Sequence, residues 1–207
     1  MYWYIIRHGE TNWNKQRLFQ GVTDIPLDDT GRKQALEAGQ RLKKKGITFK
    51  KVYTSPLERA IETAELVTGM PRNTFVIDDR IKEMFFGQLE GTDYDLVKGT
   101  EKDLFENPAK YASIPHEKGV ETYNSILDRA GDFISYLKTK EKEYSLYDNI
   151  LIQTHGACMR ALLTVLRDGQ LSDFWNIKIG NCQFFCFECK DGALSEIDVS
   201  DLSIQKS

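Results

Sequence analysis

Short apolar runs alternate with helix-like segments along most of this chain, and this alternation constrains the fold more than any other feature. Residues 2–7, 52–54 and 149–154 have the length and composition of buried strands. Segments with apolar residues at helical spacing follow, among them 28–45 and 157–166. This order is typical of α/β domains with a largely parallel sheet. No linker rich in serine, proline or glycine divides the sequence, so we expect one domain over residues 1–207.

Boundary residues predict where some of these segments begin. Asp28 is suited to cap the helix that follows it. Ser55 and Glu58 form the pattern of a capping box, with a proline at the first helical position. Residues 79–118 are the least regular part, and we expect an irregular segment at about 85–120 to cover the ends of the strands. A hairpin is expected near the C-terminus, around an Asp-Gly turn.

Charge and composition exclude several classes of partner. The chain has 28 Lys and Arg against 31 Asp and Glu, a net charge of −3. This balance argues against general binding to nucleic acids or membrane surfaces, so an anionic substrate must be held by local cations. With neither a signal peptide nor a membrane-spanning run in the sequence, we expect a cytoplasmic protein.

Three of the four cysteines have the spacing C-x3-C-x2-C, which can hold an iron–sulfur cluster on a loop. Here Cys182, Cys186 and Cys189 lie in an aromatic-rich stretch that predicts a buried strand. Alternate residues of a strand face opposite sides, so the three thiols could not converge on one cluster. We therefore expect buried, reduced thiols.

Reactive side chains follow the predicted strands. Arg7 and His8 end the first strand, Arg59 lies in the first turn of the helix after the second, Glu83 follows the third, and His155 ends the strand at 149–154. Ligands of open α/β sheets bind at the carboxyl ends of the strands, so these five side chains are expected to converge.

The chemistry of this set suits a phosphoryl group. Each guanidinium can bind two phosphate oxygens, and a neutral imidazole can attack phosphorus. We expect His8 to be the nucleophile, with Arg7, Arg59 and His155 stabilising charge on the transferred group. Glu83, protonated beside the bound phosphate, would supply the proton that the leaving alkoxide needs. No metal ion or other cofactor is required by this scheme.

The local sequence is more specific than the composition. Residues 7–14, R-H-G-E-T-N-W-N, resemble the R-H-G-[EQ]-[ST]-x-x-N signature of the histidine phosphatase superfamily, in the branch that includes cofactor-dependent phosphoglycerate mutase. Further blocks that resemble the family follow in the family's order at residues 20–27, 54–64, 83–91, 119–122 and 154–156. The matches span about three-quarters of the chain.

The resemblance implies a three-layer α/β/α sandwich with a mostly parallel sheet and one antiparallel strand. It implies that His8 is phosphorylated, that Glu83 donates the proton, and that Arg7, Arg59 and His155 form the phosphate pocket.

The same resemblance extends the site to the substrate. It implies that Asn14 contacts the phosphate and that Gln20, Gly21 and Thr23 line the substrate side. The expected partner is a small phosphorylated metabolite, with a homodimer left open.

We interpret the chain as a metal-independent phosphomonoester hydrolase of the small phosphatase type. Residues 86–91 are similar to the F-G-x-W-E-G of the smaller phosphatases, with Leu89 in the tryptophan position. The alternative is a cofactor-dependent phosphoglycerate mutase. A more remote alternative is a non-catalytic phosphate-binding module, which the presence of both His8 and Glu83 disfavours.

Two predictions concern the covering segment. His116 matches no motif, and we expect it to be a solvent-exposed bystander. Five aromatic residues could form an apolar wall beside the substrate, although packing within the cores of short helices is the interpretation that we favour. They are Phe85, Phe86, Tyr94, Phe105 and Tyr111.

Overall fold

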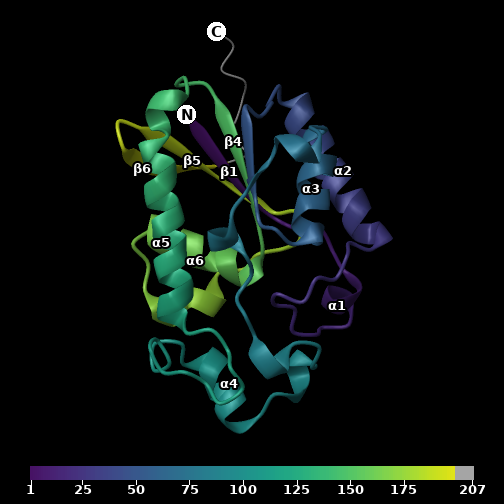
Figure 1. Ribbon diagram of the computed structural model, residues 1–207, viewed down its shortest axis with the longest axis vertical. Coiled ribbons are helices and arrows are strands. Elements are labelled where there is room, and N and C mark those ends of the chain that lie inside the picture. Colours follow the sequence, from purple (N-terminus) through teal and green to yellow (C-terminus); the bar gives the residue numbers. More distant parts are fainter. Residues whose placement is uncertain (199–207) are drawn as a thin grey trace.

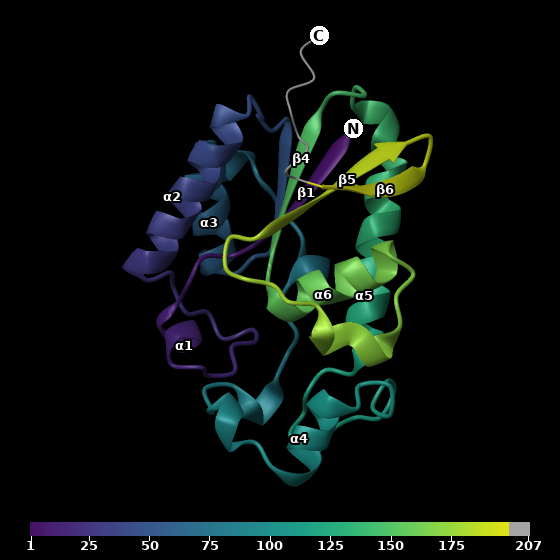
Figure 2. The same ribbon diagram turned by 180° about the vertical axis from the view of Figure 1, so that it is seen from behind.

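The computed structural model of the protein describes residues 1–198 and places a six-stranded sheet between two layers of helices (Figures 1 and 2). The strand order is β3-β2-β4-β1-β5-β6. The strands are β1 (Tyr2–Arg7), β2 (Lys51–Thr54), β3 (Val76–Ile77), β4 (Asn149–Thr154), β5 (Phe184–Lys190) and β6 (Ala193–Ile197). Strands β1 to β4 pair in parallel, and β5 is antiparallel to both of its neighbours. The predicted mostly parallel sheet with one antiparallel strand is confirmed.

Helices cover both faces of this sheet. The α-helices are α1 (Asn12–Lys15), α2 (Asp29–Lys44), α3 (Glu58–Thr68), α4 (Gly99–Glu106), α5 (Tyr123–Thr139) and α6 (Gly156–Leu166). Helices α2 and α3 lie on one face and α5 and α6 on the other, which confirms the α/β/α layering (Figure 1). None of the helices in residues 1–198 is long and apolar enough to cross a membrane. The last nine residues of the predicted 1–207 domain lie outside the described part.

The short apolar runs become strands because their alternate side chains fill two cores. On β1, Trp3 and Ile5 join the core beneath α5 and α6, whereas Tyr4 and Ile6 join the core beneath α2 and α3. All four side chains are buried. A strand that is apolar on both faces is stable only in the middle of a sheet covered on both sides, which is where β1 lies.

The register of the two central strands positions the site. β1 pairs with β4 so that Arg7 lies opposite Thr154, at the carboxyl end of both strands. The next residues, His8 and His155, are therefore neighbours, although they are far apart in the sequence. The His8 backbone N–H donates to the Thr154 carbonyl at 3.0 Å, which continues the ladder by one residue.

The irregular stretch between β3 and α5 lies beyond these strand ends. It contains α4 and the short 3-10 helices η2 (Asp79–Ile81), η3 (Gly87–Leu89) and η4 (Tyr94–Leu96). Figure 1 shows α4 below the carboxyl edge of the sheet, on the opposite side from the start of β1. The other 3-10 helices are η1 (Arg72–Thr74), η5 (Glu141–Glu143) and η6 (Leu171–Asn176).

Helix starts show one correct and one wrong prediction. The Asp28 carboxylate accepts the Gly31 N–H at 2.8 Å, as expected for the cap of α2. The capping box at Ser55 is wrong, because α3 begins at Glu58 without a side-chain cap from its preceding residue. The Glu58 N–H instead donates to the carboxylate of Asp24, at 3.0 and 3.1 Å. A residue from a distant loop therefore caps the N-terminus of α3.

The cysteine prediction is supported by the positions of the thiols. Cys186 belongs to the core beneath α2 and α3, and Cys189 to the core on the other face. Cys182 precedes β5 and lies on the Cys186 side. All are free and buried, and burial raises the pKa of Cys186 to about 12 and that of Cys189 to about 11. The three thiols therefore stay protonated and apart.

The predicted C-terminal hairpin is formed by β5 and β6. Asp191 and Gly192 connect the strands with φ angles of 53° and 76°. Two successive left-handed residues match the twist of a two-residue hairpin, which explains the Asp-Gly pair.

Candidate active site

Two buried imidazoles lie side by side at the carboxyl edge of the sheet. The ring centroids of His8 and His155 are 5.1 Å apart, and both side chains are almost fully excluded from solvent. Burial lowers the pKa of each imidazole well below its ordinary value, and the nearby charges of Arg59 and Arg7 lower it further. Both rings are therefore neutral at pH 7, as the sequence predicts for His8.

A backbone contact determines which nitrogen of His8 is free. The Nδ1 atom lies 2.7 Å from the Gly9 carbonyl oxygen. A carbonyl can only accept a hydrogen bond, so the proton of the neutral ring is on Nδ1. The Nε2 atom then carries a lone pair, as a nucleophile requires.

His155 is positioned by a residue from the neighbouring strand. Its Nε2 atom is 2.7 Å from the Ser55 hydroxyl, and Ser55 directly follows β2, the neighbour of β4 in the sheet. The same hydroxyl accepts the Leu57 N–H at 3.3 Å. The Nδ1 atom of His155 is buried and has no hydrogen-bond partner among residues 1–198.

The two predicted arginines lie at this edge and retain free donors. Arg59 is fully buried, and its guanidinium donates to the carbonyls of Gly21 and Thr23 at 2.6 and 2.9 Å. Arg7 donates to the Ile179 carbonyl at 2.9 Å. Burial lowers the pKa of Arg7, and it lowers that of Arg59 to about 10, so both stay charged at pH 7. The Nε atoms of both find no partner in the described residues, and a bound anion could accept from them.

The loop at residues 20–23 holds Arg59 through backbone carbonyls. Glu90 holds that loop, since its carboxylate accepts the Val22 and Thr23 N–H groups at 3.1 and 2.8 Å and the Thr23 hydroxyl. Gly21 leaves room for this contact, because a Cβ there would lie 2.1 Å from a carboxylate oxygen of Glu90. Glu90 lies within the family block at residues 83–91, but its role in supporting this loop is not predicted from the sequence.

Asn14 and Gln20 form a polar network beside His8. The Asn14 side-chain N–H donates to the side-chain oxygen Oε1 of Gln20 at 3.1 Å, and the Thr11 hydroxyl donates to the same oxygen at 2.7 Å. Asn181 connects this network to the His8 carbonyl, to which it donates at 3.0 Å. The side-chain nitrogen Nε2 of Gln20 is buried without a hydrogen-bond partner in the described part of the chain.

Glu83 is held at the beginning of α6. One carboxylate oxygen accepts the backbone N–H groups of Met84, Ala157 and Cys158 at 2.8, 3.0 and 2.9 Å. The first N–H groups of a helix have no partners within it, so this contact satisfies two of them. A Cβ on Gly156 would lie within 3.6 Å of both Glu83 Oε2 and Arg7 Nε, which places the two charged groups on either side of one small space.

A third arginine was missed by sequence reasoning. Arg160 lies one helical turn after Gly156, and its guanidinium would approach a Cβ on Gly156 at 3.4 Å. Burial and the nearby charge of Arg7 together lower the pKa of Arg160 to about 10. The usable signal was its spacing, because residues four apart share one face of a helix. With Arg7 and Arg59, Arg160 brings three guanidiniums to this edge of the sheet, which suits a phosphate dianion.

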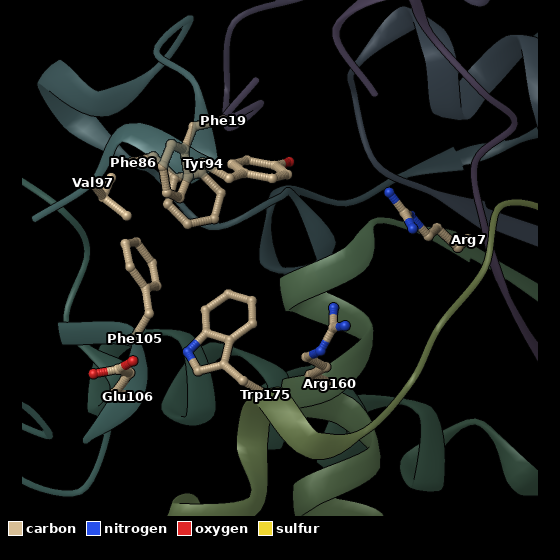
Figure 3. Close-up of a pocket in the computed structure, with 9 residues that line it drawn as sticks. All are labelled: Arg7, Phe19, Phe86, Tyr94, Val97, Phe105, Glu106, Arg160 and Trp175. Atoms are coloured by element: carbon tan, nitrogen blue, oxygen red, sulfur yellow. The ribbon is translucent and has the colours of Figure 1, made fainter. Parts of the chain in front are cut away.

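A cavity of about 410 Å³ opens from Arg7 and Arg160 (Figure 3). Five aromatic side chains line it, together with Val97 and Glu106. They are Phe19, Phe86, Tyr94, Phe105 and Trp175. Of the aromatic residues named from the sequence, Phe86 belongs to the buried core and Phe105 packs against it, so the core prediction is confirmed for these two, which also line the cavity. Tyr94 is 36% exposed and lines the cavity, so the core prediction is wrong for this residue. Those three line a cavity because α4 and its neighbours lie over the strand ends.

The other residues named in the covering segment are His116, Phe85 and Tyr111, and each lies in a different environment. His116 is buried at 8% exposure, so the expectation of an exposed bystander is wrong. Its Nδ1 atom accepts the Lys118 N–H at 3.2 Å, which closes a tight turn. Phe85 is exposed, and the Tyr111 hydroxyl donates to Asp103 at 2.6 Å.

Comparison with known families now identifies the class of protein. The sequence matches the histidine phosphatase superfamily (branch 1) over residues 3–201. The chain belongs to this superfamily. The resemblance stated from the motifs is confirmed.

Relatives within branch 1 include both phosphatases and mutases. The Bacillus subtilis phosphatase PhoE is 33% identical over 186 residues, covering 87% of this chain and 86% of the relative. A phosphoglycerate mutase from Schizosaccharomyces pombe is 31% identical over 166 residues, covering 77% and 76% of the two chains.

Solved structures share this fold over nearly the whole chain. YhfR from Bacillus stearothermophilus superposes with a TM-score of 0.81 at 28% identity, covering 97% of this chain and 96% of the other. A phosphoserine phosphatase from Entamoeba histolytica, solved with 3-phosphoglyceric acid, gives a TM-score of 0.75 at 25% identity, with 95% of each chain covered.

Proposed function

We propose that this histidine phosphatase hydrolyses phosphate monoesters of small metabolites through a phosphohistidine at His8, without a metal ion. The observation that supports this most directly is the state of His8. Its ring is neutral, its proton is held by the Gly9 carbonyl, and its Nε2 lone pair lies among guanidiniums. A buried imidazolium could not attack phosphorus, whereas this neutral ring can.

In the first step, His8 Nε2 attacks phosphorus and the bond from phosphorus to the ester oxygen breaks. Negative charge spreads over the three remaining phosphate oxygens. Arg7 and Arg59 offer their free Nε–H groups to that charge, and His155 offers Nδ1–H while Ser55 donates to its Nε2. Glu83, protonated beside the dianion, gives its proton to the leaving alkoxide.

In the second step, the Glu83 carboxylate takes a proton from water as the water oxygen attacks the phosphorus atom of phosphorylated His8. The N–P bond breaks, inorganic phosphate leaves, and His8 returns to its neutral state. Glu83 thereby alternates between acid and base, as its place beside Arg7 allows.

The second candidate is a phosphoglycerate mutase, because a mutase is among the relatives at 31% identity. A mutase must shield phosphohistidine from water and return the phosphoryl group to its substrate. Residues 86–91 resemble the smaller phosphatases, and this favours hydrolysis.

The deciding experiment measures phosphate release and phosphoenzyme formation in the wild type and in His8→Gln. The wild type should release phosphate from monoesters with EDTA present, and an alkaline quench should trap one acid-labile phosphoryl group on His8. His8→Gln should lose turnover by at least about 10³-fold, together with the phosphoenzyme.

Three outcomes would overturn the proposal. Undiminished turnover in His8→Gln would remove His8 from its role, and activity that EDTA abolishes and Mg²⁺ restores would contradict metal independence. Efficient interconversion of phosphoglycerates primed by bisphosphoglycerate, with little phosphate release, would establish the mutase instead.

A further inference from the structure

The cavity beside the arginines differs in character along its length. Arg7 and Arg160 lie at one end, and the aromatic side chains point toward the same central space from the other (Figure 3). The phosphate subsite is at the arginine end, since that is where the cations are. The alcohol part of a bound monoester must therefore extend into the aromatic part.

The aromatic wall is continuous. The ring centroid of Phe19 lies 4.5 Å from that of Tyr94 and 5.0 Å from that of Phe105. The ring centroids of Phe105 and Trp175 are 5.5 Å apart. These rings come from four separate parts of the chain: the loop after α1, η4, α4 and η6. Packing within a single short helix does not account for them. They pack against one another and against the core, and together they line the cavity.

Few polar groups of the lining are free to receive hydroxyl groups. The Trp175 indole N–H already donates to the Tyr123 hydroxyl at 2.7 Å. Glu106 is exposed and pairs with Lys102 at 3.4 Å. Beyond the two arginines, the polar side chains of the lining are Tyr94 and the exposed Glu106. A sugar with several hydroxyls would lose hydrogen bonds to water here without replacing them.

Arg160 joins the two ends of the cavity. Its guanidinium lies 5.2 Å from the centre of the Trp175 ring, in a cation–π contact. It also approaches the space beside Gly156 that Arg7 and Glu83 border. Trp175 is thereby held next to the arginine end of the cavity.

We propose that the substrates are phosphate monoesters whose alcohol carries an aromatic or compact apolar group, in preference to phosphates of polyhydroxylated sugars. This inference rests on the proposed phosphatase function. An aromatic group of this kind would stack in offset or edge-to-face geometry on Phe105 and Trp175, which are already arranged to receive it.

The experiment compares kcat/KM for 2-phenylethyl phosphate, ethyl phosphate and glucose 6-phosphate. All three are esters of primary alcohols, so differences in the leaving group are small. We expect 2-phenylethyl phosphate to exceed ethyl phosphate by about tenfold or more, as for apolar groups that fill a hydrophobic pocket. Glucose 6-phosphate should not exceed ethyl phosphate.

A matched pair of variants connects the preference to the cavity. Phe105→Ala should reduce the ratio of kcat/KM for 2-phenylethyl phosphate to that for ethyl phosphate by about tenfold, because the stacking partner is removed. Tyr147→Ala is the control, since Tyr147 is 68% exposed and absent from the cavity lining, and it should leave the ratio unchanged. Phe105→Leu, which keeps an apolar side chain, should restore part of the ratio.

The outcomes separate this inference from the function on which it rests. Phosphate release without a preference for the phenyl group, or a preference for glucose 6-phosphate, would overturn the substrate class alone. A preference that persists in a folded Phe105→Ala variant would also overturn it. Failure to release phosphate from any of the three esters would instead contradict the phosphatase function.

Discussion

At the residue scale, the site depends on imidazoles that are kept neutral by burial. His8 and His155 are both almost fully excluded from solvent and lie close to two guanidiniums. Their protonated forms would be unpaired buried cations, so the folded protein disfavours them. Keeping the nucleophile unprotonated therefore lowers stability in acid.

This cost predicts how stability depends on pH. The unfolded chain takes up a proton on each histidine below about pH 6.5, whereas folded His8 and His155 do not. The free energy of unfolding should therefore fall as the pH is lowered from 6.5 toward 5, by about 1.4 kcal/mol per pH unit for each imidazole. Urea denaturation at a series of pH values measures this slope.

The His8→Gln variant provides the check on that slope. With one buried imidazole removed, its pH dependence should be shallower by the contribution of one proton. An equal slope in the wild type and His8→Gln would mean that His8 does not bear the acid sensitivity.

At the element scale, the N-terminus of α6 is the structural support of the acid. It presents the N–H groups of Ala157 and Cys158 to Glu83, while His155, directly before the helix, faces the other imidazole. One strand-to-helix junction thus positions both His155, the proposed hydrogen-bond donor to phosphate, and Glu83, the proposed acid-base residue.

The role of Glu83 predicts a dependence on the leaving group. Glu83→Gln keeps an oxygen that can accept from α6 but cannot donate a carboxylic acid proton. Its kcat/KM for 2-phenylethyl phosphate should fall by about 10²–10⁴-fold. The loss with p-nitrophenyl phosphate should be much smaller, because nitrophenolate leaves without a proton.

Glu37→Gln is the matched control for that change, since Glu37 is exposed on α2. It should leave both substrates unaffected. Equal losses with the two esters in Glu83→Gln would argue that Glu83 positions the substrate and does not donate a proton.

At the scale of the whole molecule, the protein is acidic but its site is cationic. The net charge is −3, whereas three arginines, Arg7, Arg59 and Arg160, lie together at the site. Several buried donors there, including the Nε atoms of Arg7 and Arg59, have no partner among the described residues. A tetrahedral oxyanion would satisfy them in the folded state only.

Inorganic phosphate should therefore stabilise the fold. At a concentration 100 times its Kd, the gain is about 2.7 kcal/mol, which corresponds to a rise in Tm of roughly 5–10 °C for a chain of this size. Differential scanning fluorimetry measures the shift, with chloride at equal ionic strength as the control. Arg59→Gln should lose most of the shift, and an undiminished shift in that variant would place the phosphate elsewhere.

The sequence alone determined the element order, the sheet type and the five residues of the predicted phosphate site. Strand and helix patterns are local, and the motif residues lie at strand ends, so short stretches of sequence were sufficient. Even there, the prediction that Ser55 caps a helix was wrong, because its hydroxyl hydrogen-bonds to His155 from the neighbouring strand.

Only the tertiary structure decided the surroundings of that site. Arg160 joined it because α6 points the residue one turn after Gly156 toward Arg7. The cavity needed rings from four separate segments, and Glu90 needed the loop at 20–23 to reach it. Contacts of this kind depend on how elements pack across long sequence separations, and local patterns of apolar and polar residues do not encode them.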